Sequence, residues 1–174
     1  MLISKSLILE SLSRHIPSSL SDSILESYVD SVPSEGINGA GLFILSTKTK
    51  RILLGRRAGN DVFTGHWCTF GGGVEAGEHP LNTAMREVGE EAGISADNLN
   101  PVPCPIYDDE TKDGYKFRTY VATCKEEPEV VLNDEHTDHG WFKLIDLPKP
   151  LHPGVSRMLA TPSAIRVVMD VMNR

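Results

Sequence analysis

Acidic side chains crowd into one short stretch of the sequence, GGGVEAGEHPLNTAMREVGEEAGI, which runs from Gly71 to Ile94. Glu87, Glu90 and Glu91 are spaced three and four residues apart, which in a helix places them on one side. Like charges at this spacing oppose a helix by about 0.2–0.5 kcal/mol per pair, so stability alone does not explain them. Carboxylates are ligands that Mg²⁺ prefers, together with waters and substrate phosphates. The alternative is a solvated acidic face, but the spacing favours a site for a divalent cation.

The residues around these carboxylates predict the elements that position them. A helix is expected from Pro80 to Ala92, because Pro80 suits a helix start and Gly93 suits the left-handed residue just past a helix end. Its apolar positions fall on one face, which we expect to be buried: Leu81, Ala84, Met85, Val88 and Ala92. The preceding glycines, at 71–73, allow a tight path from strand to helix and expose backbone groups to a phosphate or a metal.

Fixed spacing turns these features into a recognisable pattern. It consists of Gly, five residues, Glu, seven residues, Arg-Glu, an aliphatic residue, any residue, Glu-Glu, any residue, Gly and an aliphatic residue. The matching positions are Gly72, Glu78, Arg86, Glu87, Val88, Glu90, Glu91, Gly93 and Ile94. With this pattern the chain resembles the Nudix hydrolases, in particular the compact MutT-like members, over roughly residues 37–148. Phe70 departs from it, since many members have proline before the glycine pair.

The resemblance implies an α/β fold, an α/β/α sandwich with a mixed β-sheet. It also implies Mg²⁺- or Mn²⁺-dependent hydrolysis of a diphosphate linkage in a nucleoside diphosphate derivative. By position, Glu87, Glu90 and Glu91 would hold the metals, with Glu87 and Glu90 also counted as catalytic. The backbone carbonyl of Gly71 or Gly72 would lie nearby. Glu78 and Arg86 would form a supporting ion pair that orients helix and loop without touching the metal.

Residues outside this pattern complete the candidate site. Glu135 lies on a loop before an expected strand, where many members keep a catalytic or metal-binding glutamate; the alternative is an ordinary exposed acid. His136 and His139 are expected to be loop histidines and not ligands. Arg56 and Arg57 end an expected strand near the site, where guanidinium groups suit phosphate oxygens, although a solvated strand end is the competing interpretation.

The pattern of apolar and polar residues in the rest of the sequence predicts how the chain is organised. Residues 1–35 carry apolar residues at helical spacing and are expected to form a short helical N-terminal extension, whereas residues 36–174 form the Nudix hydrolase domain. Strands are expected at GLFIL, RILLG, WCTF and GWFKL, with a hairpin around DDETKDG and two C-terminal helices. Trp67 and Phe70 are assigned to core packing in preference to base stacking.

Composition narrows the partners and the compartment. The chain has 174 residues and a formal net charge of -7, which argues against passive binding to nucleic acid polymers or anionic membranes. Three scattered cysteines without a CxxC pair indicate reduced thiols in a cytoplasmic protein. The N-terminal residues lack signal-peptide features, and no apolar run is long enough to span a membrane. We expect a homodimer, with the N-terminal extension as its assembly segment.

The sequence leaves the substrate open. Nucleoside triphosphates, including oxidised ones and their deoxy forms, are favoured because of the likeness to MutT-type members. The alternatives are a hydrolase of nucleotide sugars or of the ADP-ribose type, a non-catalytic nucleotide-binding regulator, and an interaction protein whose working part is residues 1–35.

Overall fold

The computed structural model describes residues 34–173, so the helices expected in the N-terminal extension lie outside the described residues. Within that range, seven strands form one sheet with the order β3-β2-β1-β6-β5, in which β4 also pairs with β1 and β7 with β2. The strands are β1 (Gly39–Ser46), β2 (Arg51–Arg57), β3 (Trp67–Cys68), β4 (Phe70–Gly73), β5 (Asn100–Glu110), β6 (Lys116–Cys124) and β7 (His136–Phe142). The β1–β6 pair is parallel and β1–β2 is antiparallel, so the expected mixed sheet is confirmed.

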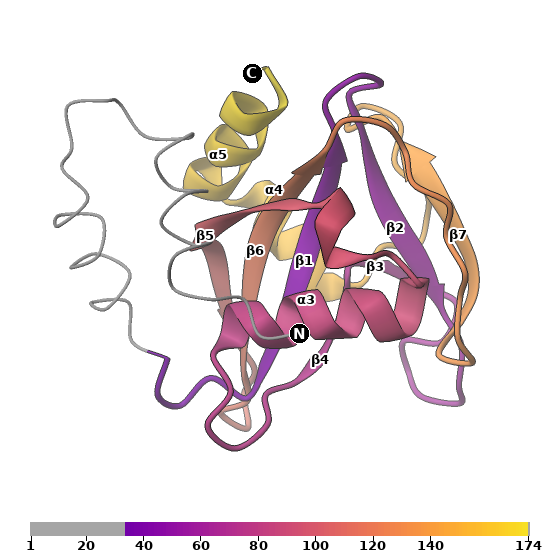
Figure 1. Cartoon of the computed structure of the whole chain (residues 1–174). Helices are drawn as coiled ribbons and strands as arrows, with labels where there is room; N and C mark the ends of the chain where they lie inside the picture. Colours follow the sequence, from indigo (N-terminus) through magenta and orange to yellow (C-terminus); the bar gives the residue numbers. More distant parts are fainter. Residues whose placement is uncertain (1–33, 174) are drawn as a thin grey trace, which may run out of the picture.

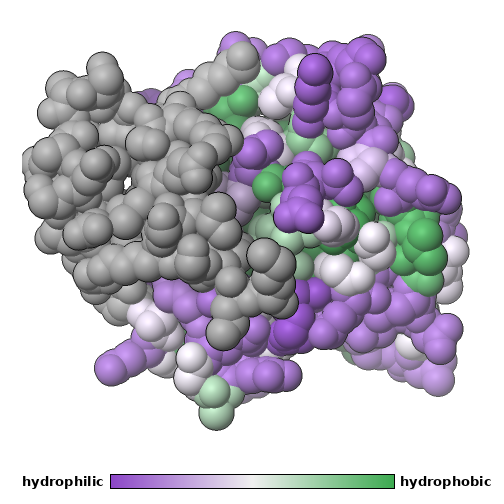
Figure 2. All heavy atoms as spheres, in the orientation of Figure 1, coloured by the Kyte–Doolittle hydropathy of each residue, from purple (hydrophilic) through white to green (hydrophobic). Residues whose placement is uncertain are grey.

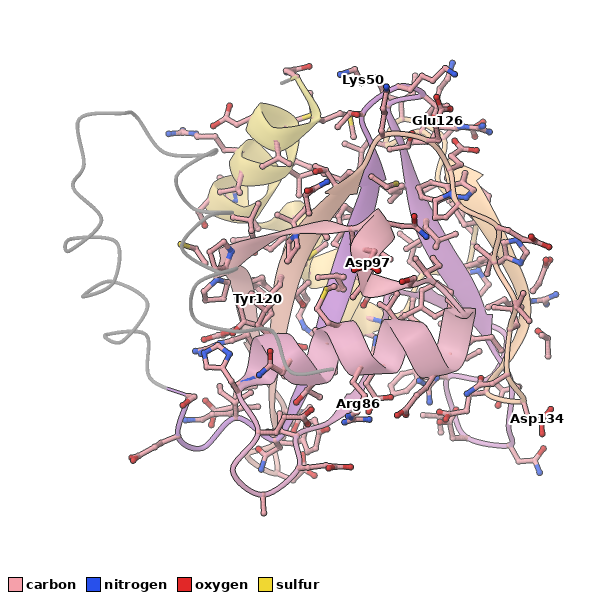
Figure 3. The ribbon with its side chains drawn as sticks, viewed as in Figure 1. Lys50, Arg86, Asp97, Tyr120, Glu126 and Asp134 are labelled. Atoms are coloured by element: carbon pink, nitrogen blue, oxygen red, sulfur yellow. The ribbon has the colours of Figure 1, made fainter. Side chains whose placement is uncertain are left out.

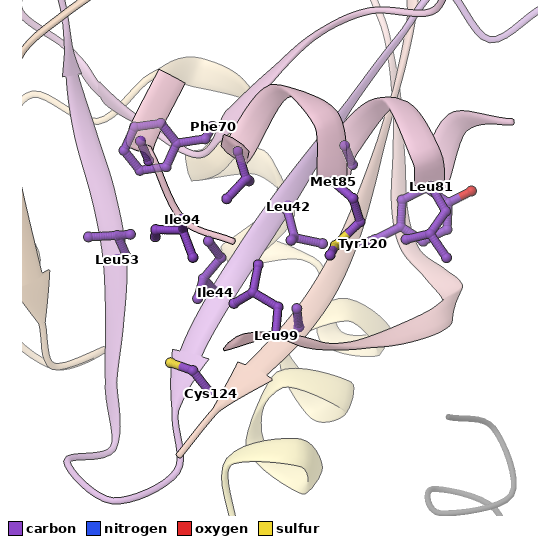
Figure 4. Packing of buried hydrophobic residues seen from close by; sticks show 14 of the residues in the cluster. Leu42, Ile44, Leu53, Phe70, Leu81, Met85, Ile94, Leu99, Tyr120 and Cys124 are labelled. Atoms are coloured by element: carbon purple, nitrogen blue, oxygen red, sulfur yellow. The ribbon is translucent and has the colours of Figure 1, made fainter. Parts of the chain in front are cut away.

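Helices cover both faces of the sheet, as the sandwich predicts (Figure 1). They are α3 (Pro80–Ala92), the short 3₁₀ helix η1 (Ala96–Asn98), α4 (Pro153–Ala160) and α5 (Pro162–Met172). Every residue of β1 is buried, which marks it as the central strand. Its side chains alternate between the faces, with Leu42 and Ile44 in the cluster under α3 (Figure 4) and Phe43 and Leu45 in the cluster under α4 and α5.

Helix α3 begins and ends where the sequence predicts. Pro80 is its first residue, and the Leu81 N–H donates to Nδ1 of the N-cap residue His79 at 3.2 Å. At the other end Gly93 adopts a left-handed conformation with φ 65°, and its N–H donates to the Gly89 carbonyl. A residue with a Cβ is strained at such a φ, which explains the glycine. These two ends fix the register of the three glutamates between them.

The predicted hairpin and C-terminal helices are also present. Strands β5 and β6 pair around the turn at 111–115, and α4 and α5 follow the last strand. Hydrophilic residues dominate the visible surface around α3 (Figure 2), whose inward face packs on the sheet. Among the described residues, no helix has the length and apolar character needed to cross a membrane.

Candidate active site

The two adjacent glutamates at the end of α3 lie in opposite environments. Glu91 is only 3% exposed, and its Oε2 accepts a hydrogen bond of 2.8 Å from the Gly71 N–H. The Glu90 side chain is 58% exposed and pairs with Arg86 at 3.1 Å. Successive helix residues are about 100° apart, so Glu90 and Glu91 diverge on either side of Glu87. The structure places Glu91 on the buried side of α3 and Glu90 on its solvent side, with Glu87 between them.

Glu87 lies between these two, against the glycine loop. A Cβ added to Gly72 would be 2.5 Å from the Glu87 carboxyl carbon, so only a glycine leaves that carboxylate its present place. Arg86 Nη1 lies 2.8 Å from Glu87 Oε1. The structure thus brings Glu87 and Glu91 to consecutive residues of β4, Gly72 and Gly71, and leaves Glu90 on the solvent side.

The ion pair expected between Arg86 and Glu78 is present. Arg86 Nε donates to Glu78 Oε1 and Nη2 donates to Oε2, both at 3.2 Å. Arg86 also donates to the Gly73 carbonyl, and Glu78 accepts from the Thr83 hydroxyl at 2.7 Å. Figure 3 shows Arg86 extending from α3 toward the loop that precedes the helix. These bonds tie the loop to α3, so they fix the glycine loop relative to the carboxylates.

Burial and mutual repulsion shape the electrostatics of the carboxylates. Burial raises the pKa of Glu91 to about 8, although the hydrogen bond from the Gly71 N–H lowers it. The negative charges of Glu135 and Glu87 also raise this pKa. Burial also raises the pKa of Glu87, to which Glu90 and Glu135 contribute by repulsion. Glu135 therefore lies close enough to act on both carboxylates. It occupies the turn before β7, where its carbonyl accepts from the Ala58 N–H at 2.8 Å.

The metal ligands implied by the pattern are only partly assembled. Within residues 34–173, no three His, Cys, Asp or Glu side chains form a group that could hold a metal ion as they stand. The donor set nevertheless fits a hard cation, because it consists of carboxylate oxygens and backbone carbonyls. The repulsion that raises the pKa values of Glu87 and Glu91 is also what a bound cation would relieve. The residues present therefore suit Mg²⁺ or Mn²⁺.

The two arginines at the end of β2 have different surroundings. Arg57 lines a cavity, pairs with Asp61 at 3.0 Å, and has a buried Nε without a hydrogen-bond partner in the described part of the chain. Arg56 is exposed, and its Nε donates to the Gly65 carbonyl at 3.3 Å. Adjacent strand residues point to opposite faces, which is why only Arg57 faces the cavity.

His136 was expected in a loop, and that expectation is wrong. It is the first residue of β7 and is 7% exposed, with Nε2 3.7 Å from the Cys68 sulfur and its ring against Phe70. His139, also expected in a loop, lies exposed within β7. The pairing of β7 with β2 extends the strand further back than the local sequence indicates. The core assignment of Phe70, which is fully buried, is confirmed.

A cavity of about 880 Å³ adjoins the carboxylates. Cavities of several hundred Å³ are typical of small-molecule sites. Gly71, Gly72, Arg57 and Glu135 line it, so the candidate residues from α3, β2 and the turn before β7 meet at its edge. It is also lined by residues that the sequence analysis did not single out: Tyr107, Asp109, Tyr115, Phe117, Thr119 and Arg157. The signal for several of these was available in the alternation of Tyr115, directly before β6, with Phe117 and Thr119 inside that strand.

Comparisons with known proteins point in one direction. The model of the NUDIX domain matches residues 37–161. The nucleoside triphosphatase NudI of Escherichia coli is 37% identical over 49% of this chain and 67% of its own length. Among solved structures, the Nudix hydrolase RenU from M. smegmatis has a TM-score of 0.63 and 25% identity, covering 78% of this chain and 86% of its own. A MutT Nudix hydrolase from Burkholderia pseudomallei has a TM-score of 0.53 and 28% identity, covering 76% and 95%.

Proposed function

The chain belongs to the Nudix hydrolases, enzymes that cleave diphosphate linkages in nucleotides, and on that premise we propose that it hydrolyses nucleoside triphosphates with Mg²⁺ as cofactor. The observation that carries the proposal is the meeting of the Glu87 and Glu91 carboxylates with Gly72 and Gly71 at the edge of the cavity. Carboxylate oxygens and the cavity of about 880 Å³ thereby lie side by side. NudI, as a nucleoside triphosphatase, supports this choice of substrate class.

The proposed roles follow from where each side chain lies. Glu87 and Glu91 would hold the metal with a carbonyl of Gly71 or Gly72, and Glu90 would join them only by leaving Arg86. A bound Mg²⁺ neutralises charge on phosphate oxygens and lowers the pKa of a coordinated water. Glu135, exposed at the cavity edge, takes the proton of the attacking water as general base.

Two arginines support these groups in different ways. Arg57 lines the cavity, and its guanidinium would donate to a phosphate oxygen, which a planar guanidinium suits. Arg86, held by Glu78, keeps the glycine loop and α3 in register, so it acts as a positioning residue.

A panel of nucleoside triphosphates, their deoxy and oxidised forms, nucleotide sugars and ADP-ribose tests the proposal. We expect Mg²⁺-dependent release of phosphate or pyrophosphate from triphosphates, at rates above those for the other two classes. Ion chromatography of the products identifies the bond that is cleaved. Turnover that persists in excess chelator contradicts the metal assignment. Tight nucleotide binding without turnover of any substrate would instead favour a non-catalytic regulator.

The homodimer is a separate proposal, with residues 1–35 as its assembly segment. Light scattering of the full chain and of a chain lacking residues 1–35 tests it. We expect loss of the dimer with hydrolysis retained; a monomeric full chain contradicts it.

A further inference from the structure

Two glycines of β1, Gly39 and Gly41, leave a stretch of this strand beside the cavity without side chains, and we call this stretch the glycine floor. The residues of β1 that face α4 and α5 are, in order, Gly39, Gly41, Phe43 and Leu45. Phe43 and Leu45 fill the core on that side, whereas the two glycines contribute nothing to it. Gly41 pairs with Gly71 across the β1–β4 ladder, so the hollow adjoins the strand that meets the Glu91 carboxylate.

The ring of Phe117 lies over this glycine floor. A Cβ added to Gly39 would be 2.8 Å from Phe117 Cδ2, and one added to Gly41 would be 2.9 Å from Phe117 Cζ. The ring therefore spans β1 between two positions where any larger residue would displace it. Phe117 lines the cavity and belongs to neither hydrophobic cluster of the described residues. A large aromatic side chain that is half-buried beside an active site and outside the core has a surface to offer a ligand.

Tyr115 links this ring to the catalytic end. Its hydroxyl would be 2.4 Å from a Cβ on Gly39, and the Gly72 carbonyl oxygen would be 3.1 Å from the same point. The Tyr115 hydroxyl and Gly72 thus lie on the same side of Gly39, next to Phe117. Whatever rests on Phe117 is therefore within a short reach of the glycine loop that meets the carboxylates.

We propose that Phe117 is a nucleobase-stacking residue, and that the base of the substrate stacks on the cavity side of the Phe117 ring, which covers the glycine floor of β1, while the phosphates extend to Gly71 and Gly72. This inference rests on the proposed nucleotide hydrolase function and names a residue for one part of it. Stacking on an aromatic ring accepts any base, because every base has a π-face. The site therefore takes nucleotides with little selectivity among the four bases.

The polar groups nearest the ring support this tolerance. Asp109 is the cross-strand partner of Phe117 and also lines the cavity. Its carboxylate accepts from Arg157 Nε at 2.9 Å, from Arg157 Nη2, and from the Tyr107 hydroxyl at 3.3 Å. A carboxylate with these partners has little capacity left to select one base edge over another.

The test compares Phe117→Leu with the wild type on ATP, GTP, CTP and UTP. Loss of stacking is expected to raise KM for all four by about 5- to 100-fold, with kcat changed by less than about threefold. Phe117→Tyr keeps the ring and is expected to bring KM most of the way back. Inorganic tripolyphosphate, which has no base, is expected to inhibit wild type and Phe117→Leu equally.

A matched control separates stacking from general destabilisation. Phe142→Leu removes the same ring from a residue that packs on Trp67 outside the cavity lining, so it should lower the thermal midpoint and leave KM alone. An unchanged KM in Phe117→Leu overturns the inference, as does an equal loss of affinity for tripolyphosphate. Saturation-transfer NMR with AMP and GMP measures base contact without turnover. If the wild type hydrolyses nothing but binds both through Phe117, the proposed function fails and the stacking residue stands.

Discussion

The carboxylate end of α3 and the glycine floor of β1 adjoin the same cavity, through Gly71 and Gly72 in one case and Phe117 in the other, yet they are built by opposite means. The first gathers charged side chains, and burial together with their mutual repulsion raises the pKa values of Glu87 and Glu91. The second removes side chains, so that a ring from β6 can lie where a β1 residue would otherwise point. The carboxylate end of α3 comes from one short stretch of the sequence. The glycine floor depends on the register of β1, β4 and β6. Substitutions that delete charge should therefore act on turnover, and substitutions that add volume should act on geometry.

The largest effect is expected from Glu91→Gln, which keeps shape and removes charge from the buried carboxylate. A metal supplies several kcal/mol of transition-state stabilisation, so kcat/KM is expected to fall by about 10³-fold or more. Glu90→Gln is the matched control, because Glu90 is exposed and paired with Arg86; a loss of about tenfold or less is expected. Steady-state kinetics at saturating Mg²⁺ provide the measurement. Equal activity of Glu91→Gln and wild type would remove the basis of the metal site.

The next largest effect on turnover is expected at Glu135, the proposed general base. Glu135→Gln is expected to lower kcat by about 10²-fold or more, the lower part of the range for general acid–base catalysis. Its free energy of unfolding should hardly change, because the side chain is exposed and the contacts from this residue use its backbone. Single-turnover kinetics test the expected fall in rate, and denaturant unfolding tests the unchanged free energy of unfolding. A rate that barely moves would make Glu135 an ordinary loop acid.

Adding a methyl group to the glycine loop tests the position of the Glu87 carboxylate without removing its charge. Gly72→Ala would bring its Cβ 2.5 Å from the Glu87 carboxyl, which must then move, whereas the nearest atom to a Cβ on Gly73 is 4.0 Å away. A displacement of about 1 Å at a reacting centre is worth up to about 10²-fold in rate. We expect a loss of about 10- to 10²-fold for Gly72→Ala and almost none for Gly73→Ala. Similar rates for the two variants would mean that the position of Glu87 has little effect on turnover.

The sequence predicted the carboxylate end of α3 better than the glycine floor of β1. The ends of α3 and the Arg86–Glu78 pair follow from local spacing, and both are present. Local spacing did not reveal that Glu91 turns inward, because that depends on β4 lying against α3. Nor did it reveal that Gly39 and Phe117 lie side by side, because they meet only through the parallel register of β1 and β6.

A smaller effect is expected at the end of β2. Arg57→Ala removes a guanidinium that faces the cavity, and a hydrogen bond to a charged group is worth enough to raise KM by about tenfold. Arg56→Ala, one residue away and turned to solvent, should change KM by less than about threefold. Inhibition by inorganic pyrophosphate provides an independent measure of phosphate binding. Equal effects of the two substitutions would show that neither guanidinium contacts the substrate directly.

The last prediction concerns the pH dependence of stability, measured in chelator. Burial raises the pKa of Glu91 in the folded state to about 8, above its ordinary value of 4.5, so the native state keeps a proton that the unfolded chain releases between these values. Because the native state then binds more protons, this group makes the free energy of unfolding fall as pH rises from about 4.5 to 8.

His136 acts in the opposite direction over part of this range. Burial lowers its pKa from 6.5 to about 4, so its contribution to stability rises with pH between those values. That contribution is common to the wild type and to Glu91→Gln, so it cancels when the two profiles are subtracted. Urea unfolding from pH 5 to 8 should therefore show Glu91→Gln gaining stability relative to wild type as pH rises, while Glu90→Gln follows the wild-type profile. Parallel profiles for Glu91→Gln and wild type would mean that the buried carboxylate is already ionised without metal, and that the repulsion among these glutamates is relieved by the fold itself.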